Sequence, residues 1–310
     1  MSLDMNIVQH GIAGTRRAGP RAVLRRFRRT LLAAALGAAA LAGPAHTQPA
    51  GVDDPPVQQN KLDSTLRRLV PADQIERQAA QQYDQLKQAA AQKRALAPEN
   101  YPDLVRLRNI AQRMLPIAPR WNERARSWRW EVNLIGSAQV NAFCMPGGKI
   151  AVYLGLIRTL KPTDDELAVV LGHEIAHALL EHSRERLAKD QLTQLGANVV
   201  SQLFNLGQLG NTALGLGANM LSLKFSRGDE TEADRVGLEL AARAGYDPRA
   251  GITLWQKMEK ASSGAPPEWL SSHPAGTSRI RDIETQLPRV LPYYATATHR
   301  SMADLPPAPQ

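Results

Sequence analysis

The chain has 310 residues, 43% of them hydrophobic and 22% charged, and it contains one cysteine, Cys144. This composition is sufficient for a buried core, while a single cysteine excludes a fold held by internal disulfides. The formal net charge is +9, but seven Arg and one Asp fall within the first 45 residues, which leaves about +3 on the remainder. No basic patch with interleaved aromatic residues is present, so nucleic acid is not an expected partner.

The first 45 residues have the pattern of an export signal. An arginine-rich stretch precedes the uncharged residues 31–42, which are rich in Ala and Leu, and Gly43-Pro44-Ala45 offers small residues for cleavage. The apolar run is shorter than the roughly 20 residues that a transmembrane helix needs. We therefore predict a signal peptide over residues 1–45 and a periplasmic location, with an uncleaved signal anchor as the alternative.

A polar linker and a helical extension are predicted next. Residues 46–60 are rich in Pro, Gln and Asp, which is typical of a linker. Within residues 61–98, Asp73 and Glu76 have the spacing of a capping box, and apolar residues at helical spacing predict a helix to about Arg94, packed along the protein body.

A helix and three strands are predicted after this extension. The helix follows Pro102. Alternation of apolar and polar residues predicts a strand over residues 128–134, and further strands are expected over residues 139–143 and 149–153. The turn signal Pro146-Gly147-Gly148 joins the last two.

The central motif is His173-Glu174-Ile175-Ala176-His177, inside an apolar run that predicts a helix over residues 162–183. Residues four apart share one helix face, so His173 and His177 can both direct a ring nitrogen at one Zn²⁺. Glu174 lies beside them, where it can take a proton from a metal-bound water.

A third ligand is expected from the segment Ser226–Asp234. Glu230 and Asp234 share a helix face, so one can bind the metal while the other holds the far nitrogen of a ligand histidine. The alternative pattern H-x-x-G-x-x-H fails, because Ser183 stands where its histidine should be. His182 is five residues past His177, so on a continuous helix it turns away, and we interpret it as a surface histidine.

These motifs resemble zinc metalloproteases of the HtpX, BepA and LoiP type, which are related to the CAAX prenyl endopeptidases. H-E-x-x-H is followed by S-R-x-x-E-x-x-A-D, and residues 141–148 and His273-Pro274 with Arg279 resemble two further family segments. The similarity covers about residues 100–290. It implies one Zn²⁺ per chain bound by His173, His177 and Glu230.

The resemblance also assigns supporting roles. It implies Glu174 as the base, Asp234 as a helper and Glu232 as a bystander. His273 or Arg279 is a candidate donor to the oxyanion that develops opposite the metal. The resemblance to BepA implies instead that His273 occupies the open metal position and holds the enzyme latent; a loop cap is the third interpretation.

Two further segments are expected to contact partners. Asn141, Ala142 and Phe143 are candidates for a sheet edge that pairs with a substrate backbone, although Phe143 is equally compatible with a core position. Residues 191–223 carry no charge, but repeated amides and glycines oppose a membrane span. We predict a helical pair with a glycine-rich tip there, acting as a lid or touching a membrane surface.

The sequence therefore predicts an α+β fold, mostly α, with a zincin-like metalloprotease domain over residues 99–294 and a small antiparallel sheet beside the cleft. Residues 295–310 are polar and Pro-rich and are expected to be disordered. The predicted function is cleavage of misfolded periplasmic or outer-membrane proteins. The alternatives are a zinc-binding chaperone with little proteolysis and a membrane-embedded prenyl-protein endopeptidase, for which the expected spans are lacking.

Overall fold

The computed structural model describes residues 67, 70–190, 193, 224–262, 268–273 and 279–309. The predicted leader and linker lie outside the described residues, as does nearly all of the uncharged segment 191–223. Among the helices that are described, none has the length and apolar character needed to cross a bilayer. The fold is mostly helical with a small sheet, which confirms the predicted class.

The sheet has three strands, β1 (Glu131–Ile135), β2 (Ala142–Met145) and β3 (Lys149–Tyr153), in the order β1-β3-β2. β2 and β3 form the predicted antiparallel hairpin. Its turn contains Gly147 and Gly148, both at φ +78°, a region that favours glycine.

The pairing of β1 differs from the prediction, because β1 runs parallel to β3. The expectation of a purely antiparallel sheet was therefore wrong. The hairpin docks on β1 through β3, its second strand, and β3 runs in the direction of β1. This arrangement leaves β2 at an edge of the sheet.

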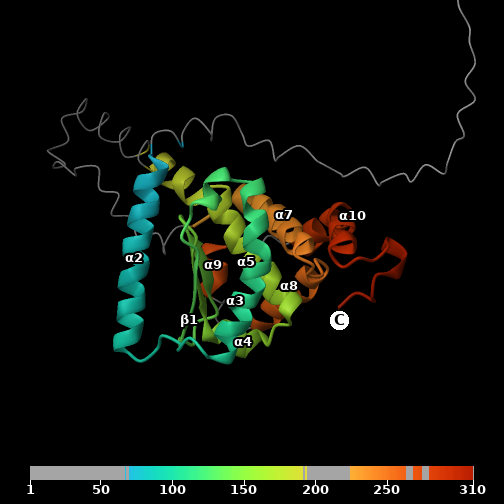
Figure 1. Ribbon diagram of the computed structural model, residues 1–310, viewed down its shortest axis with the longest axis horizontal. Coiled ribbons are helices and arrows are strands. Elements are labelled where there is room, and N and C mark those ends of the chain that lie inside the picture. Colours follow the sequence, from blue (N-terminus) through green and yellow to red (C-terminus); the bar gives the residue numbers. More distant parts are fainter. Residues whose placement is uncertain are drawn as a thin grey trace, which may run out of the picture. The chain divides into compact units, whose positions relative to one another are not determined.

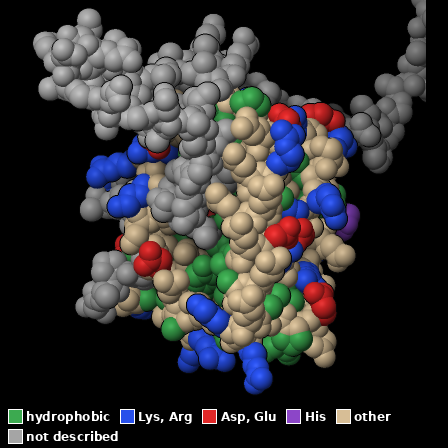
Figure 2. All heavy atoms as spheres, turned by 90° about the vertical axis from the view of Figure 1, so that its left-hand side faces the viewer, with side chains coloured by type: hydrophobic (Ala, Val, Ile, Leu, Met, Phe, Trp, Pro, Cys, Tyr) green, Lys and Arg blue, Asp and Glu red, His purple; other side chains and the backbone are tan. Residues whose placement is uncertain are grey.

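Helix α2 (Ala72–Gln92) covers one face of the sheet (Figure 1). Its buried side chains pack with strand residues of that face: Ile75, Ala79 and Tyr83 from the helix, with Met145 and Ala151 from the strands. The Tyr83 hydroxyl donates to the Ile150 carbonyl and accepts from Asn133 Nδ2 at 3.1 Å. The helix therefore packs along the body as predicted. Figure 2 shows the outer surface of the protein on the side of α2, where basic and acidic side chains occur together.

The predicted capping box of α2 does not form. Pro71 stands at the N-cap, and the helix has no side-chain cap. Glu76 accepts hydrogen bonds from Arg124 and from Trp128 Nε1 at 2.9 Å. The Glu76 carboxylate, which the sequence pattern predicted to cap the start of the helix, therefore binds residues from another part of the chain.

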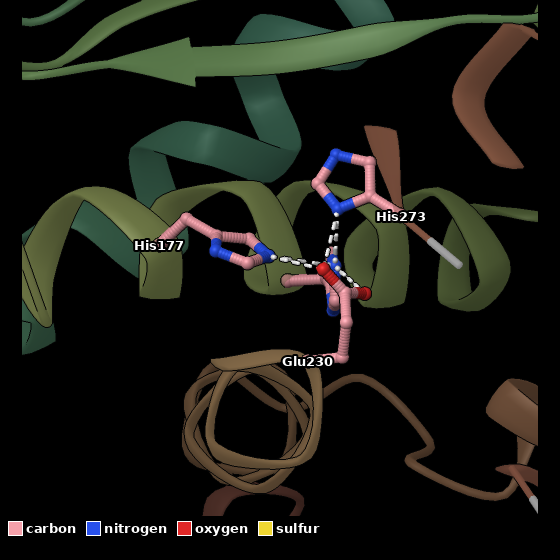
Figure 3. A group of neighbouring side chains, drawn as sticks. His177, Glu230 and His273 are labelled. Atoms are coloured by element: carbon pink, nitrogen blue, oxygen red, sulfur yellow. Dashed lines mark hydrogen bonds and ion pairs between the residues drawn. The ribbon is translucent and has the colours of Figure 1, made fainter. Parts of the chain in front are cut away.

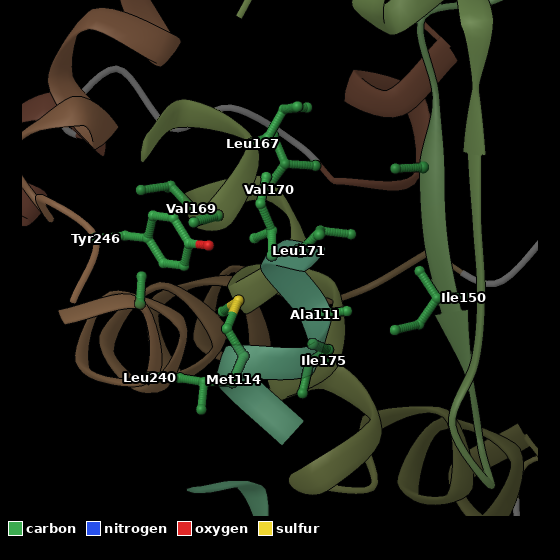
Figure 4. Packing of buried hydrophobic residues seen from close by; sticks show 14 of the residues in the cluster. Ala111, Met114, Ile150, Leu167, Val169, Val170, Leu171, Ile175, Leu240 and Tyr246 are labelled. Atoms are coloured by element: carbon green, nitrogen blue, oxygen red, sulfur yellow. The ribbon is translucent and has the colours of Figure 1, made fainter. Parts of the chain in front are cut away.

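The other face of the sheet packs against α3 (Pro102–Met114) and α5 (Asp164–Leu179). The strand residues of this face alternate with those that meet α2, as the period of a strand requires. Figure 4 shows Leu171 and Ile175 of α5 packed with Ala111 and Met114 of α3.

α5 is buried on all sides, with 14 of its 16 residues inaccessible. It begins at a capping box in which Thr163 and Glu166 satisfy each other's backbone N–H groups. Glu166 is itself buried, and its carboxylate accepts from Thr253 Oγ1 at 2.8 Å and from Lys257 Nζ at 2.6 Å. The helix that carries the H-E-x-x-H motif is therefore fixed along its whole length.

α7 (Arg227–Arg243) packs closely on α5. A Cβ on Gly172 would lie 2.5 Å from the Gly237 carbonyl oxygen, and a Cβ on Gly237 would lie 2.6 Å from the His173 backbone nitrogen. Real contacts are never this short, so glycine at both positions permits the approach.

The remaining helices surround this pair. They are α4 (Leu154–Leu160), α8 (Ala250–Ala261), α9 (Glu268–Ser272) and α10 (Arg279–Ala297), with 3₁₀ turns at Leu115–Arg120, Glu123–Arg126 and Met302–Asp304. The tail differs from the expected disorder, since α10 continues through Ala297. Arg249 Nη2 then donates to the Pro306 carbonyl at 2.9 Å, and this contact ties the following segment to the body.

Candidate metal centre

The two histidines of the motif present their Nε2 atoms to one point. His173 and His177 lie one turn apart on α5, and these nitrogens are 3.1 Å apart. Both side chains are buried. The helix therefore supplies a converging pair of nitrogen ligands, as the spacing predicted.

Glu230 completes the set from α7. Its Oε2 lies 3.4 Å from His173 Nε2, and its Oε1 lies 3.5 Å from His177 Nε2. Figure 3 shows the Glu230 carboxylate beside the imidazole of His177 and beneath the ring of His273. Burial would raise the pKa of Glu230, but hydrogen bonds from His173 and His177 hold that pKa well below its ordinary value. These contacts favour the ionised form of the carboxylate, which is the form that can bind a metal.

These atoms have the spacing of a zinc site. Ligand atoms arranged tetrahedrally at about 2.0–2.1 Å from zinc are separated from one another by about 3.3–3.4 Å. The observed separations among His173, His177 and Glu230 are 3.1–3.5 Å. The two imidazoles and the carboxylate therefore fit zinc in number, chemistry and distance.

His273 belongs to the same group of potential ligands. Its Nδ1 lies 3.0 Å from Glu230 Oε1 and 3.3 Å from His173 Nε2, and the four candidate ligand atoms lie within 4.8 Å of one another. With His273 as a fourth ligand, a tetrahedral zinc would have no position left for water. The geometry therefore favours the interpretation in which His273 fills the open position.

Asp234 lies behind His173, as the helix spacing predicted. Its Oδ1 accepts from His173 Nδ1 at 2.9 Å. Burial would lower the pKa of His173, but Asp234 and Glu230 raise this pKa to about 9. Asp234 therefore sets both the orientation and the charge preference of the His173 ring.

Arg279 is not among the residues that line the cavity with Glu174 and His177, and its role as an oxyanion donor stays a prediction. Its guanidinium donates to Glu230 Oε2 and to Asp234 Oδ1, each at 2.7 Å. It also lies 4.2 Å from the Trp255 ring centroid. Its Nη2 also lies 3.2 Å from His173 Nδ1, so the guanidinium brings positive charge to the two carboxylates beside the candidate ligands.

His182 is buried, contrary to its interpretation as a surface histidine. α5 ends at Leu179, Glu181 has a positive φ of 59°, and a new helical segment covers residues 182–190. The break returns His182 to the site, where its Nδ1 lies 2.9 Å from His177 Nδ1. Glu232, expected to be a bystander, places Oε2 at 3.6 Å from His182 Nε2.

Two aromatic residues that the sequence analysis did not select also line the site. Trp269 of α9 donates from Nε1 to Glu174 Oε1 at 2.6 Å. Phe225 stacks on His177 with ring centroids 4.0 Å apart. An apolar residue near a motif has no sequence signal that separates it from the core, so neither contact was accessible beforehand.

The chain matches the model of peptidase family M48 over residues 105–287. The chain belongs to peptidase family M48. Peptidases of this family depend on zinc, so the predicted cofactor agrees with the family and with the ligand geometry. The resemblance to HtpX and BepA proteins is therefore correct at the level of the family.

Relatives within M48 include mitochondrial metalloendopeptidases. The chain is 43% identical over 152 residues to the mitochondrial metalloendopeptidase OMA1 of Arabidopsis thaliana, covering 49% of this chain and 30% of that protein. It is 35% identical over 196 residues to OMA1 of Schizosaccharomyces pombe, covering 62% and 56%. The β-barrel assembly-enhancing protease of Escherichia coli is 31% identical over 171 residues, covering 51% and 34%.

The alignments with the OMA1 proteins span between 30% and 63% of the length of those relatives. They also correct the predicted periplasmic location. The relatives with higher identity are named as mitochondrial, in plants, fungi and mammals, and the bacterial relatives have lower identity.

Proposed function

We propose that this M48 chain is a zinc-dependent endopeptidase. The observation that supports this most directly is the convergence of His173, His177 and Glu230 from two helices, with Glu174 beside them. Zinc bound there supplies Lewis acidity to the scissile carbonyl and lowers the pKa of water to about 7. The relatives named as metalloendopeptidases support the same reaction.

Glu174 is the proposed general base. It is buried beside the ligands and lines the same cavity as His177 and β2. Trp269 Nε1 donates to Oε1, so this bond fixes the carboxylate and leaves Oε2 to accept a proton from water. Glu174 then passes that proton to the leaving amine.

The outer edge of β2 is the proposed binding site for the substrate backbone. Tyr153 N donates to Asn141 O, so residues 141, 143 and 145 point their backbone groups at β3. Ala142 and Cys144 consequently direct theirs outward, toward the cavity that contains Glu174 and His177. The Ala142 N–H donates to Asn141 Oδ1, which leaves the Ala142 carbonyl and both Cys144 groups for substrate.

Backbone pairing of this kind gives affinity without reading side chains. It suits an enzyme that cleaves unfolded segments of many sequences. We therefore propose misfolded or misassembled membrane proteins as substrates, on the support of the bacterial relatives whose name refers to β-barrel assembly. A zinc-binding assembly factor with little proteolysis is the second candidate.

The deciding experiment compares purified wild type with Glu174→Gln. Wild type should contain about one zinc per chain and cleave casein, and a chelator should stop cleavage until zinc is restored. Glu174→Gln should retain zinc and lose at least about a hundredfold in rate. The assembly-factor function would be favoured if zinc-loaded wild type did not cleave casein. It would also be favoured if Glu174→Gln restored a deletion strain as fully as wild type does.

His273→Ala separates the two roles proposed for His273. If His273 closes the metal position, its removal should raise the cleavage rate, because a water position opens. If His273 stabilises the transition state instead, the rate should fall by about tenfold or more. Zinc content measured on the same samples shows whether ligand loss explains either result.

A further inference from the structure

His182 occupies an unusual position for a residue outside the H-E-x-x-H motif. It is 2% exposed, and its Nδ1 lies 2.9 Å from His177 Nδ1, the nitrogen that faces away from the ligand cluster. Its other nitrogen, Nε2, finds no hydrogen-bond partner in the part of the chain that the structure describes. The carboxylate that faces this atom is that of Glu232, whose Oε2 lies 3.6 Å away.

If His177 binds metal through Nε2, only one arrangement of protons is possible along the row His177, His182 and Glu232. A neutral imidazole carries one proton, so that proton must be on His177 Nδ1. His182 Nδ1 must then accept it, which places the proton of His182 on Nε2. That N–H points toward Glu232, whose ionised carboxylate can act only as an acceptor.

The two ligand histidines are therefore supported differently. His173 donates directly to Asp234, which Arg279 neutralises. His177 has no carboxylate at its Nδ1, and an imidazole stands between it and the nearest acid. Both acids, Asp234 and Glu232, come from α7, the helix that also supplies Glu230.

We propose that His182 and Glu232 are positioning residues that hold His177 in its zinc-binding orientation and tautomer. Phe225 stacks on the His177 ring with an interplanar angle of 27°, so it limits tilting, while His182 fixes rotation within the ring plane. Partners of this kind typically contribute ten- to hundredfold to metal affinity. The inference rests on the proposed function, since it assumes that His177 binds zinc.

The test measures zinc affinity by chelator competition in the full chain. His182→Phe keeps an aromatic ring but removes the acceptor, so the zinc dissociation constant should rise about ten- to hundredfold. His182→Asn places an amide oxygen near the former Nδ1 and should recover most of this loss. Thr231→Ala, at an exposed position between the site residues of α7, is the matched control and should bind like wild type.

A second readout is the visible spectrum of the cobalt-substituted protein, which reports ligand geometry. His182→Phe should change it, and Thr231→Ala should not. Wild-type affinity and an unchanged spectrum in His182→Phe would overturn the proposal. If circular dichroism shows that His182→Phe is not folded, Glu232→Ala is measured in its place. Weaker zinc binding by Glu232→Ala than by Thr231→Ala supports the positioning role of His182 and Glu232, and equal binding refutes it.

Failure of this inference can be distinguished from failure of the proposed function. Wild type that binds no zinc contradicts the proposed function itself. If wild type binds zinc and cleaves casein, and the His182 and Glu232 variants bind zinc as tightly as wild type, only the positioning role of His182 and Glu232 is contradicted.

Discussion

Replacing Arg279 with methionine tests how the buried charges behind the metal site are balanced. Arg279 is 6% exposed and donates to Glu230 and Asp234 at 2.7 Å each. Arg279→Met keeps an unbranched apolar stem but leaves the buried Glu230 carboxylate and the partly buried Asp234 carboxylate without their guanidinium. Removing one partner from a buried ion pair costs about 3–5 kcal/mol.

The metal-free protein should show this cost in full. A domain of this size loses about 2–4 °C of melting temperature per kcal/mol, so the expected fall is about 6–20 °C. Bound zinc brings two positive charges to Glu230, so the zinc-loaded variant should lose less. The difference between the two states is therefore the signature of charge compensation.

Calorimetry of both proteins with zinc and with chelator measures this difference. Arg281→Met is the control, because Arg281 is exposed on the same helix. Equal melting temperatures for Arg279→Met and Arg281→Met in chelator would refute the charge argument. Equal losses for Arg279→Met with and without zinc would show that packing, including the contact with Trp255, carries the effect.

Three further outcomes are expected. Gly237→Ala should cost about 3 kcal/mol in urea unfolding and weaken zinc binding, because a Cβ there meets the His173 backbone, whereas Gly228→Ala meets no backbone and should be neutral. Burial opposes but does not cancel the lowering of the Glu131 pKa by Lys149 and Lys87. Glu131→Gln should therefore lower the free energy of unfolding by roughly 1 kcal/mol at neutral pH, and this difference should vanish as the pH falls below about 4. Urea unfolding of both proteins at several pH values measures it. Chelation should lower the melting temperature of wild type, and an unchanged value would contradict a site that binds zinc only in the folded state.

The elements that the sequence predicted best are those whose signal is local. The spacing of His173 and His177 on one helix face was sufficient to place their nitrogens together, and the spacing of Glu230 and Asp234 placed one acid on each side of a ligand. Which of these two acids is the ligand and which is the helper was implied only by the resemblance to HtpX and BepA proteins and stays a prediction. The β2–β3 hairpin followed from its Pro-Gly-Gly turn.

The features that were missed depend on tertiary contacts or on a break in regular structure. His182 was placed on a continuous helix, but the backbone at Glu181 leaves the helical region and reverses that inference. The parallel pairing of β1 depends on which strand of the hairpin docks, and the sequence does not encode this locally. Trp269 reaches Glu174 only because α9 folds back from a distant part of the chain.

The contact between Gly172 and Gly237 has a consequence for how the protein can vary. Because peptide groups, rather than side chains, set the separation of α5 and α7 at this point, the span between the imidazoles and Glu230 is insensitive to the volumes of neighbouring residues. Substitutions elsewhere in the interior can then alter the free energy of unfolding while the ligand spacing stays constant. Thermal tolerance and hydrolytic chemistry are thereby open to independent adaptation.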